Sequence, residues 1–542
     1  MDFAVAFNKY VEGKPIMRFR LRGTMVLTKG IKLFLLAFLA GTLSDTGAQA
    51  QTINAASCSS TDVQAAFNAV TSSITTVNIP AGTCHWTSEV VLAVPTGSTT
   101  LSILGAGNLS TLGGGDATVI VDDYVSSSPD LAITTGNASS KFRLAGITFK
   151  GGTGSVKFNG MVGFVGFTQN LRIDHDHFLN PVSTGAGLRM TGWMYGVIDH
   201  NLCDLNGTGS VNNCFRVSTG ANWNGDTAGQ GDKAWADSPY FGTSQALFIE
   251  DNTINNGYVN DCDSGSHQVI RHNTINGGNI QAHEMANDMR GCRVTEVYQN
   301  TFSSISVPIT IRAGTGMFWG NSGAFNIGTG FLELDLDRSN TQHGFAAPPA
   351  NWGFCGTQAT GAVDSSWDQA DSTLTGYACL DQPGRGKGDL LTGFFPNKIN
   401  SVSGVISWPR QAVEPIYEFD NGGMNAASVF AFSTSVGCSI SVCTTPTNAD
   451  RDYYQHSTNF NGTSGTGTGL LSARPATCTA GLGGNTPGVG YFATDTSTLY
   501  VCNPANTWSA YYTPYTYPHP LTLNSGSGNS PAPPTGLSVT VH

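Results

Sequence analysis

The chain has 542 residues, a formal net charge of −11, 12% charged residues and 67 glycines. Its length allows a large core, and its acidic balance argues against nucleic acid or an anionic membrane as the main partner. Few charges beside abundant glycine, serine, threonine and asparagine are typical of a β-rich secreted protein.

Residues 1–50 are predicted to be a cleaved signal peptide. Two lysines precede the apolar run Leu33–Ala40, and a small-x-small site ends at Ala50. The start of translation could equally be Met17 or Met25. The apolar run is too short to span a bilayer and no later stretch is longer, so we expect secretion and no membrane span.

Twelve cysteines all lie beyond the signal peptide, and an even number in an oxidising compartment favours disulfides. No pair of CxxC motifs is present, so a zinc site is not expected. Connectivity stays open at this stage. The local pairs that we expect are Cys58–Cys84, Cys203–Cys214, Cys262–Cys292, Cys355–Cys379, Cys438–Cys443 and Cys478–Cys502.

Residues 51–140 predict a helical cap followed by short strands. "SSTDVQAAFNAV" (59–70) combines a helix-start signal with an amphipathic pattern. "TTVNIPAGTCHW", "LSILGAG" and "ATVIVDD" then read as the first strands. A helix in this place would shield the end of a stack of strands from edge-to-edge association.

Residues 141–330 repeat one phrase, a short strand, a turn and a second short strand. The phrase recurs about every 20–27 residues, apart from one interval that a Gly-, Asp- and Trp-rich loop lengthens, and such a period indicates a solenoid. The residues at the turn are Asp176, Asn201, Asn252, Asn273, Asn300 and Asn321.

Apolar residues recur on both sides of each turn. Three positions earlier stand Ile173, Ile198, Ile249, Ile270, Val297 and Phe318. Two positions later stand Phe178, Cys203, Ile254, Ile275 and Phe302, and then Gly323 breaks the rule. Stacked coils would place each set in an interior column and the turn amides in a hydrogen-bonded ladder. The prediction is an all-β, single-stranded, right-handed parallel β-helix; the alternative is a β-sandwich with chance Asn-Thr turns.

These phrases resemble the pectate-lyase-like superfamily of secreted right-handed β-helix proteins. The resemblance rests on "ASCSSTDVQAAFNAV", "FRLAGITFKGG" and the "NTI" coils, and covers roughly 53–520. "GYACLDQPGRG" and "YTYPHPL" resemble a bacterial subgroup of it. The resemblance implies the fold and a bacterial extracellular or periplasmic location. The superfamily contains lyases, glycoside hydrolases, epimerases, esterases, depolymerases and adhesins, so activity has to be argued from the site.

The period fades beyond residue 330. Residues 331–443 are expected to form an irregular, disulfide-pinned excursion and the last coils, and 444–522 are expected to form strands that flank the helix. Residues 523–542 read as a Gly/Ser/Pro linker and tail.

The densest group of ionisable residues spans 261–312 in a chain otherwise poor in charge. Asp263 and Arg290 lie at the same offset before their turn residues, and Arg312 lies one residue closer to its own. The three are therefore predicted to share one face of successive coils. The plainer interpretation is a solvated face whose charges pair with one another.

The first functional hypothesis is a polysaccharide lyase acting on a uronate-containing polymer by β-elimination. Arg290 and Arg312 would neutralise the substrate carboxylate, His283 would remove the proton, and Tyr298 or His272 would protonate the leaving oxygen. Further substrate contacts are expected from the positions that differ between coils. These are Arg271, Arg293, Glu284 and Trp319.

Hydrolysis is the second hypothesis. Asp261 and Asp263, followed by His283 and Arg312, resemble the order of elements in inverting β-helix glycosidases, although Cys262 separates the two aspartates. A binding or adhesin role is the third hypothesis, since several tryptophans and tyrosines could stack on sugars, or could simply pack in the core. In each case a monomer that contacts a polysaccharide is expected.

A calcium site is also predicted from the aspartates near the first turns. Asp174 and Asp199 occupy the same position on adjacent coils, and Asp176 lies beside them. Stacked carboxylates repel one another unless a cation or hydrogen bonds intervene, and Ca²⁺ prefers oxygen ligands. The alternative is an exposed stack that carries no metal.

Overall fold

The computed structural model describes residues 51–136, 139–182, 185–205, 212–226, 229, 231–284, 290–305, 308–325, 331–335, 381–386, 391–392, 399–400, 412–422, 430–433 and 447–523. The expected signal peptide, the tail beyond 523, and the expected pairs Cys355–Cys379 and Cys438–Cys443 lie outside these residues.

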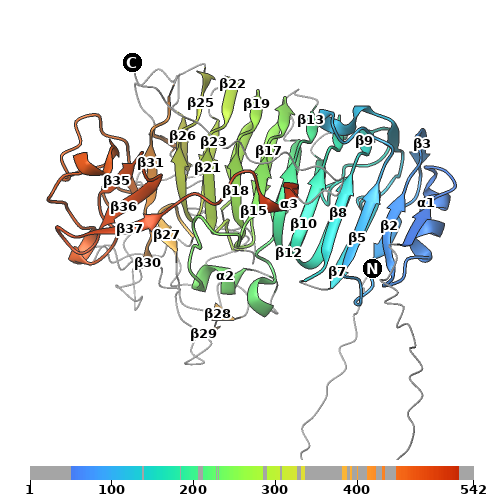
Figure 1. Ribbon diagram of the computed structural model, residues 1–542, viewed down its shortest axis with the longest axis horizontal. Coiled ribbons are helices and arrows are strands. Elements are labelled where there is room, and N and C mark those ends of the chain that lie inside the picture. Colours follow the sequence, from blue (N-terminus) through green and yellow to red (C-terminus); the bar gives the residue numbers. More distant parts are fainter. Residues whose placement is uncertain are drawn as a thin grey trace, which may run out of the picture. The chain divides into compact units, whose positions relative to one another are not determined.

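Three ladders of parallel strands wind around a common core (Figure 1). Ladder 1 consists of β1 (Gln51–Asn54), β2 (Ile74–Asn78), β5 (Thr100–Leu104), β8 (Lys141–Ala145), the second halves of β10 (Val162–Asp174) and β12 (Ala186–Asp199), β15 (Leu247–Glu250), β18 (His267–Arg271), β21 (Val294–Tyr298), β24 (Thr315–Trp319), β31 (Ile416–Phe419) and β33 (Tyr453–Tyr454).

Ladder 2 precedes ladder 1 in each coil. It consists of β4 (Val90–Ala93), β7 (Leu131–Gly136), the first halves of β10 and β12, β14 (Asn213–Ser218), β17 (Tyr258–Cys262), β20 (Asn279–Ala282), β23 (Ile309–Ile311), β26 (Leu332–Asp335) and β32 (Phe430–Ser433). β10 and β12 run through the corner between the two ladders, with a register shift between Thr168 and Leu171 on β10.

Ladder 3 follows the Asn turn of each coil. It consists of β3 (Gly82–Trp86), β6 (Thr118–Asp122), β9 (Thr148–Gly151), β11 (His177–Leu179), β13 (Leu202–Asp204), β16 (Thr253–Asn255), β19 (Thr274–Asn276), β22 (Thr301–Ile305) and β25 (Ser322–Phe325). The ladders confirm a parallel β-helix rather than a sandwich.

The predicted Asn ladder is present. Nδ2 of Asn201 donates to Oδ1 of Asn252 at 3.0 Å, and the same bond continues to Asn273, Asn300 and Asn321 at 2.9–3.0 Å. Asn421 extends the ladder at 2.9 Å, although it lies 100 residues after Asn321. The amides satisfy backbone groups at the corner that would otherwise be buried without a partner.

The residue before each turn residue has a left-handed backbone conformation, with φ from 53° to 62°. Among non-glycine residues, histidine, aspartate and asparagine tolerate this conformation best. The residues concerned are His175, His200, Asp251, His272, Gln299, Gly320 and Asp420. The histidines at this position therefore have a backbone reason to be there.

Both predicted interior columns are buried. Ile173, Ile270 and Phe318 are fully inaccessible, as are Phe178 and Ile275 on the other side of the turn. Gly323 breaks the second column for a steric reason, because a Cβ at this glycine would lie 2.0 Å from the carbonyl oxygen of Phe302.

The predicted helical cap is α1 (Ser60–Asn68), inserted between β1 and β2. Its N-cap residue Ser59 accepts a hydrogen bond from the backbone N–H of Asp62 at 3.2 Å, and its inner side buries Val63 and Phe67. Figure 1 shows α1 beside the first coils.

The C-terminal residues cover part of ladder 1. Four strands form a mixed sheet, β34 (Thr466–Gly469), β35 (Gly490–Ala493), β36 (Thr498–Cys502) and β37 (Trp508–Tyr512). Phe492 packs on Trp319 and Phe419, with ring centroids 5.3 and 4.7 Å apart. We call residues 513–523 the strap; it runs back along ladder 1 and ends in α3 (Pro520–Leu523) beside β10 and β12 (Figure 1).

Shorter elements flank the coils. They are α2 (Asp232–Ala236), the antiparallel pairs β27 (Arg385–Gly386) with β30 (Ala412–Val413) and β28 (Leu391–Thr392) with β29 (Ile399–Asn400), and the 3-10 turns Leu112–Gly115, Trp223–Gly225, Leu471–Ala473 and Leu482–Gly484.

Four of the expected disulfides are present. They are Cys58–Cys84, Cys203–Cys214, Cys262–Cys292 and Cys478–Cys502. In the described parts of the chain, every helix is too short or too polar to cross a bilayer.

Candidate functional site

From β12 to β26, the outward surface of ladder 2 carries a row of polar residues, one on each strand. Strand pairing aligns these residues on adjacent coils. Their neighbours on each strand, such as Cys262 and Ala282, point into the core, so the row itself points outward. Adjacent strands lie about 4.8 Å apart, so an extended polymer lying along the row would meet one of these residues about every 4.8 Å. The aligned residues are Arg189, Arg216, Asp261, Gln281, Thr310 and Glu333.

A second row begins where the ladder 2 strands end. The backbone N–H of His283 donates to the carbonyl of Cys262 at 2.8 Å, and that of Arg312 donates to Ala282 at 2.9 Å. His283 therefore stacks on Asp263, and Arg312 stacks on His283. Asp335 continues the row, because Leu334 pairs with Ile311. We call these two rows together the ladder 2 face.

The prediction that Arg290 shares this face is wrong. The corner between β20 and β21 is longer than the one between β17 and β18. Counting ten residues back from Asn300 therefore stops at Arg290, within the corner, and does not reach His283, which is the residue aligned with Asp263. Arg290 is fully buried and bonds to Asp381 at 2.5–3.1 Å and to Asp232 at 3.0 Å. Its charge is neutralised inside the protein, so it does not reach a substrate.

Arg293 is likewise buried away from the ladder 2 face. It forms an ion pair with Glu414 at 2.7 Å and donates to the carbonyl of Asp237 at 2.9 Å. Trp235 lies under the guanidinium groups of both Arg290 and Arg293, with 5.0 and 5.5 Å to the ring centroid. This tryptophan therefore packs in the core and does not stack on a sugar.

Arg271 is fully buried beneath the strap. Its guanidinium donates to Glu250 at 2.7 Å, to the Tyr298 hydroxyl at 2.9 Å, and to the carbonyls of Tyr515 and Thr516 at 2.7 and 2.9 Å. These bonds anchor the strap to the coils, so the expected substrate contact is not available.

The two proposed proton donors, Tyr298 and His272, also pack against other side chains of the protein. Tyr298 is 1% exposed and stacks on Trp319 at 4.7 Å, and burial raises its pKa above the ordinary value. His272 stacks on Tyr517 of the strap at 3.6 Å, and burial lowers its pKa. Trp319 donates to the Tyr512 hydroxyl at 3.2 Å under the C-terminal sheet. None of the three lies on the ladder 2 face.

At one end of the ladder 2 face, arginines lie among aspartates. Arg216 donates to Asp261 at 3.3 Å, and their side chains are 22% and 12% exposed. Arg189 lies near both Asp261 and Asp263; burial lowers its pKa and the charge of Arg216 acts in the same direction. Charges of both signs are thus held close together at the surface.

His283 and Glu284 form the middle of the face. The Nδ1 atom of His283 lies 2.8 Å from the carbonyl oxygen of Glu284, which only accepts, so Nδ1 carries the proton. In the neutral ring Nε2 then keeps a lone pair, and the side chain is 15% exposed. This tautomer is the one that a general base requires.

Arg312 joins the middle of the face to its other end. It lies 3.4 Å from Glu284 and 3.2 Å from Asp335, with its side chain 19% exposed. Two carboxylates therefore hold the guanidinium in place from either side.

Asp174 and Asp199 are aligned as predicted, but arginines relieve their repulsion. Arg143 binds Asp174 through two bonds of 2.6–2.7 Å, and Arg172 binds Asp199 through two bonds of 2.8–2.9 Å. Asp176 lies inside the coil, where it accepts from the backbone N–H of Ile147 and burial raises its pKa well above its usual range. The three aspartates thus form no single cluster. Within the described ranges, no group of three His, Cys, Asp or Glu residues could hold a metal ion.

The sequence interpretation missed Arg189, Arg216, Glu333 and Asp335. A signal was present in "GLRMTG" and "CFRVS", where a single arginine stands between apolar residues that alternate in a strand. Such an arginine points outward when its neighbours point into a core.

No protein-family model and no curated protein matches the sequence. Among solved structures, an alginate lyase from Paenibacillus sp. str. FPU-7 is similar at 13% identity and a TM-score of 0.32, covering 52% of this chain and 98% of that one. The catalytic domain of a GH87 α-1,3-glucanase, a D1069A variant in complex with tetrasaccharides, is similar at 14% identity and a TM-score of 0.29, covering 57% and 61%. At this level of similarity the function has to be inferred from the residues themselves.

Proposed function

We propose that the protein is a secreted enzyme that hydrolyses a polysaccharide on the ladder 2 face, with Asp261 and Asp263 as its pair of carboxyl groups. Asp261 lies on β17 with its side chain 12% exposed, and Asp263, which is 5% exposed, follows directly after the end of that strand. At strand spacing their Cα atoms lie about 6.6 Å apart. Inverting glycoside hydrolases hold their two carboxyl groups roughly 6.5–9.5 Å apart, which leaves room for the attacking water. The observation that carries the proposal is that both carboxyl groups lie close to Arg189 and that Arg216 bonds to Asp261.

The neighbours of the two aspartates suggest separate roles. Arg216 donates a hydrogen bond to Asp261 and holds this carboxyl group in place, so Asp261 is assigned as the base that activates water. Asp263 then acts as the acid that protonates the leaving glycosidic oxygen. His283 and Arg312 follow on the next two coils and would orient the sugar rings.

The charges of the face favour a substrate that is largely neutral. Three guanidinium groups, Arg189, Arg216 and Arg312, lie among the carboxylates of Asp261, Asp263, Glu284, Glu333 and Asp335. Arg216 and Arg312 are already paired with carboxylates, which leaves them less available to a densely anionic polymer. For this reason, and because Arg290 is buried, hydrolysis replaces β-elimination as the first hypothesis.

One observation keeps β-elimination as the second candidate. His283 has its proton on Nδ1 and a lone pair on Nε2, and Arg312 stacks on it from the next coil. A base beside a guanidinium is the pair that proton removal next to a carboxylate requires.

Secretion is part of the same proposal. Four disulfides within one chain are typical of an oxidising compartment such as the periplasm or the exterior of the cell.

The test is incubation of the chain from residue 51 onward with a panel of neutral and acidic polysaccharides. New reducing ends without ultraviolet absorbance from an unsaturated product are expected for hydrolysis, and both signals together are expected for elimination. Asp261→Asn and Asp263→Asn should each abolish cleavage, whereas Asp495→Asn, at an exposed turn of the C-terminal sheet, should not change it. Full activity in both variants would contradict the proposal.

A further inference from the structure

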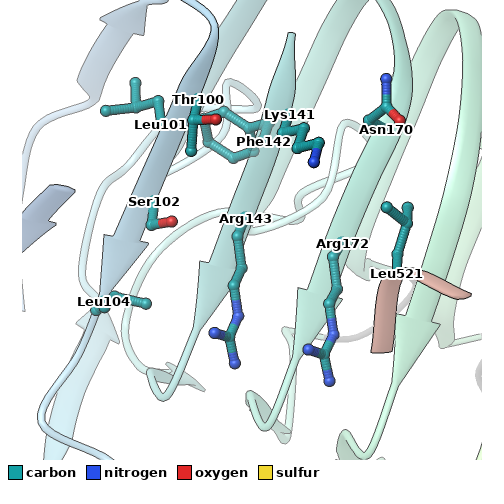
Figure 2. A pocket seen from close by; sticks show the side chains of 10 residues that line it. All are labelled: Thr100, Leu101, Ser102, Leu104, Lys141, Phe142, Arg143, Asn170, Arg172 and Leu521. Atoms are coloured by element: carbon teal, nitrogen blue, oxygen red, sulfur yellow. The ribbon is translucent and has the colours of Figure 1, made fainter. Parts of the chain in front are cut away.

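Ladder 1 carries a second polar groove on its first coils, outside the ladder 2 face. Two rows of side chains point outward there. Thr100, Lys141 and Asn170 form one row, and Ser102, Arg143 and Arg172 form the other. Figure 2 shows Arg143 and Arg172 extending side by side from adjacent strands, with Lys141 and Asn170 at the other end of these strands.

The groove has two adjacent hollows. One of about 290 Å³ is lined by these two rows, and one of about 400 Å³ lies against Tyr195, Gln245 and Tyr515. Asn170 and Leu521 line both hollows, so the two lie next to each other beside the strap.

Several groups in the first hollow have no bond to the described protein. Lys141 is exposed, and neither its ammonium nor the hydroxyls of Thr100 and Ser102 has a partner among the described residues. Arg143 uses Nε and Nη2 for Asp174 and leaves Nη1 without a partner among those residues. The hollow thus offers donors and a cation that only water or a ligand satisfies.

The local charge is positive where a ligand would lie. Asp174 and Asp199 are 0% exposed and are held behind the guanidinium groups, whereas Lys141 and Arg143 reach solvent. In a chain of net charge −11, such a surface stands out. Guanidinium and ammonium groups beside hydroxyls suit a carboxylate on a sugar ring.

The second hollow adds a surface for a neighbouring sugar. Tyr515 contributes a partly exposed aromatic ring, and Gln245 and Asn170 contribute amides. Tyr195 also lines the hollow, but it is 6% exposed and its ring packs on Trp223. Aromatic rings with adjacent amides are the usual lining of a sugar-binding site. The two hollows therefore fit an acidic unit followed by another unit of the same chain.

We propose that this groove is a second carbohydrate-binding site, which takes a uronate residue of an acidic oligosaccharide. Lys141 binds the carboxylate, Ser102 and Asn170 bind ring hydroxyls, and Tyr515 borders the next sugar. The site lies on a different ladder from Asp261 and Asp263, so it binds rather than cleaves. It would hold acidic branches or blocks of a polymer while another part is cut.

Isothermal titration calorimetry with trigalacturonate tests this site in the full chain carrying Asp261→Asn, which prevents turnover of the probe. One bound trimer per chain is expected. Lys141→Gln should weaken binding about fivefold and salt should weaken it further, because the contact is a partly exposed ionic one. Lys150→Gln removes an equal charge from β9 of ladder 3 and should leave the affinity unchanged.

Two ligand controls separate the sources of affinity. Fully methyl-esterified trigalacturonate, which has no charge, should bind at least fivefold more weakly; equal binding of the ester would overturn the proposal. Galacturonate alone should bind more weakly than the trimer, and equal affinities would overturn the extension into the second hollow. No binding of the trimer, or an equal loss in Lys150→Gln, would also overturn the site. Because cleavage is measured separately, these outcomes leave the hydrolase proposal untouched.

Discussion

Arg216 on β14 donates a hydrogen bond to Asp261 on β17, with 3.3 Å between Nη2 and Oδ2. The two residues are aligned on neighbouring coils and both reach solvent, with side chains 22% and 12% exposed. A partly exposed pair of this kind contributes only about 0–1 kcal/mol to folding. The pair therefore matters more for how Asp261 is positioned for chemistry than for the stability of the coil.

Arg216→Ala is expected to lower kcat for polysaccharide cleavage by about tenfold or more, because the base loses the group that positions it. The free energy of unfolding should change by about 1 kcal/mol at most. Initial rates and urea unfolding of the same preparations check both expectations. An unchanged kcat would remove Arg216 from the active site.

Arg271→Ala should lower the stability and leave the activity unchanged, which is the opposite of Arg216→Ala. It leaves Glu250 buried without its partner and releases two carbonyls of the strap, so the free energy of unfolding should fall by about 3–5 kcal/mol. At a temperature where the variant is still folded, kcat/KM should equal that of the wild type. A loss of activity without a loss of stability would restore Arg271 as a substrate-binding residue.

Asn273→Ala interrupts the Asn ladder at its middle. The Asn273 amide is buried and bonds to Asn300, to Ile249 and to the backbone of its own turn. Loss of these bonds leaves buried backbone groups without partners, and about 2–3 kcal/mol of stability should be lost. Chemical unfolding measures the change, and Asn68→Ala at the exposed end of α1 is the matched control. Equal stabilities of the two variants would contradict a structural role for the ladder.

Stability should depend on pH through Glu296. Burial raises its pKa to about 7, so the folded state holds a proton that the unfolded state has released. The stabilisation is full below the ordinary glutamate pKa and is lost as pH rises through about 7, and its size is about 1–3 kcal/mol. Urea midpoints measured across this interval should fall in the wild type and fall less in Glu296→Gln. A midpoint that rises with pH through this interval, with no difference between the two proteins, would contradict this account.

Calcium removal tests the role of the aspartates on ladder 1. Because Arg143 and Arg172 already neutralise Asp174 and Asp199, we expect EDTA to leave the Tm unchanged. A lower Tm that added Ca²⁺ restores would instead support the calcium site predicted from the sequence.

The candidate site was predicted in part. Of the three residues predicted to share one face, Asp263 and Arg312 do so, and Asp261 and His283 also lie there. Arg290 was misplaced because its position was counted along the chain across a corner whose length differs between coils. Tyr298 and Trp319 were misassigned because residues far along the chain cover them; Tyr512, bonded to Trp319, is 193 positions away.

The sequence by itself determined the β-helix, its interior columns and its Asn ladder. Each coil must bury the same face and satisfy the same turn, so the same residue types return at the same offsets and are visible without coordinates. Only the tertiary structure decided which charges are available. Arg271, Arg290 and Arg312 look alike in sequence, yet the strap buries the first, Asp381 and Asp232 neutralise the second, and the third stays at the surface between Glu284 and Asp335. The strap and Asp381 come from distant segments, and nothing in the local pattern encodes where a distant segment packs.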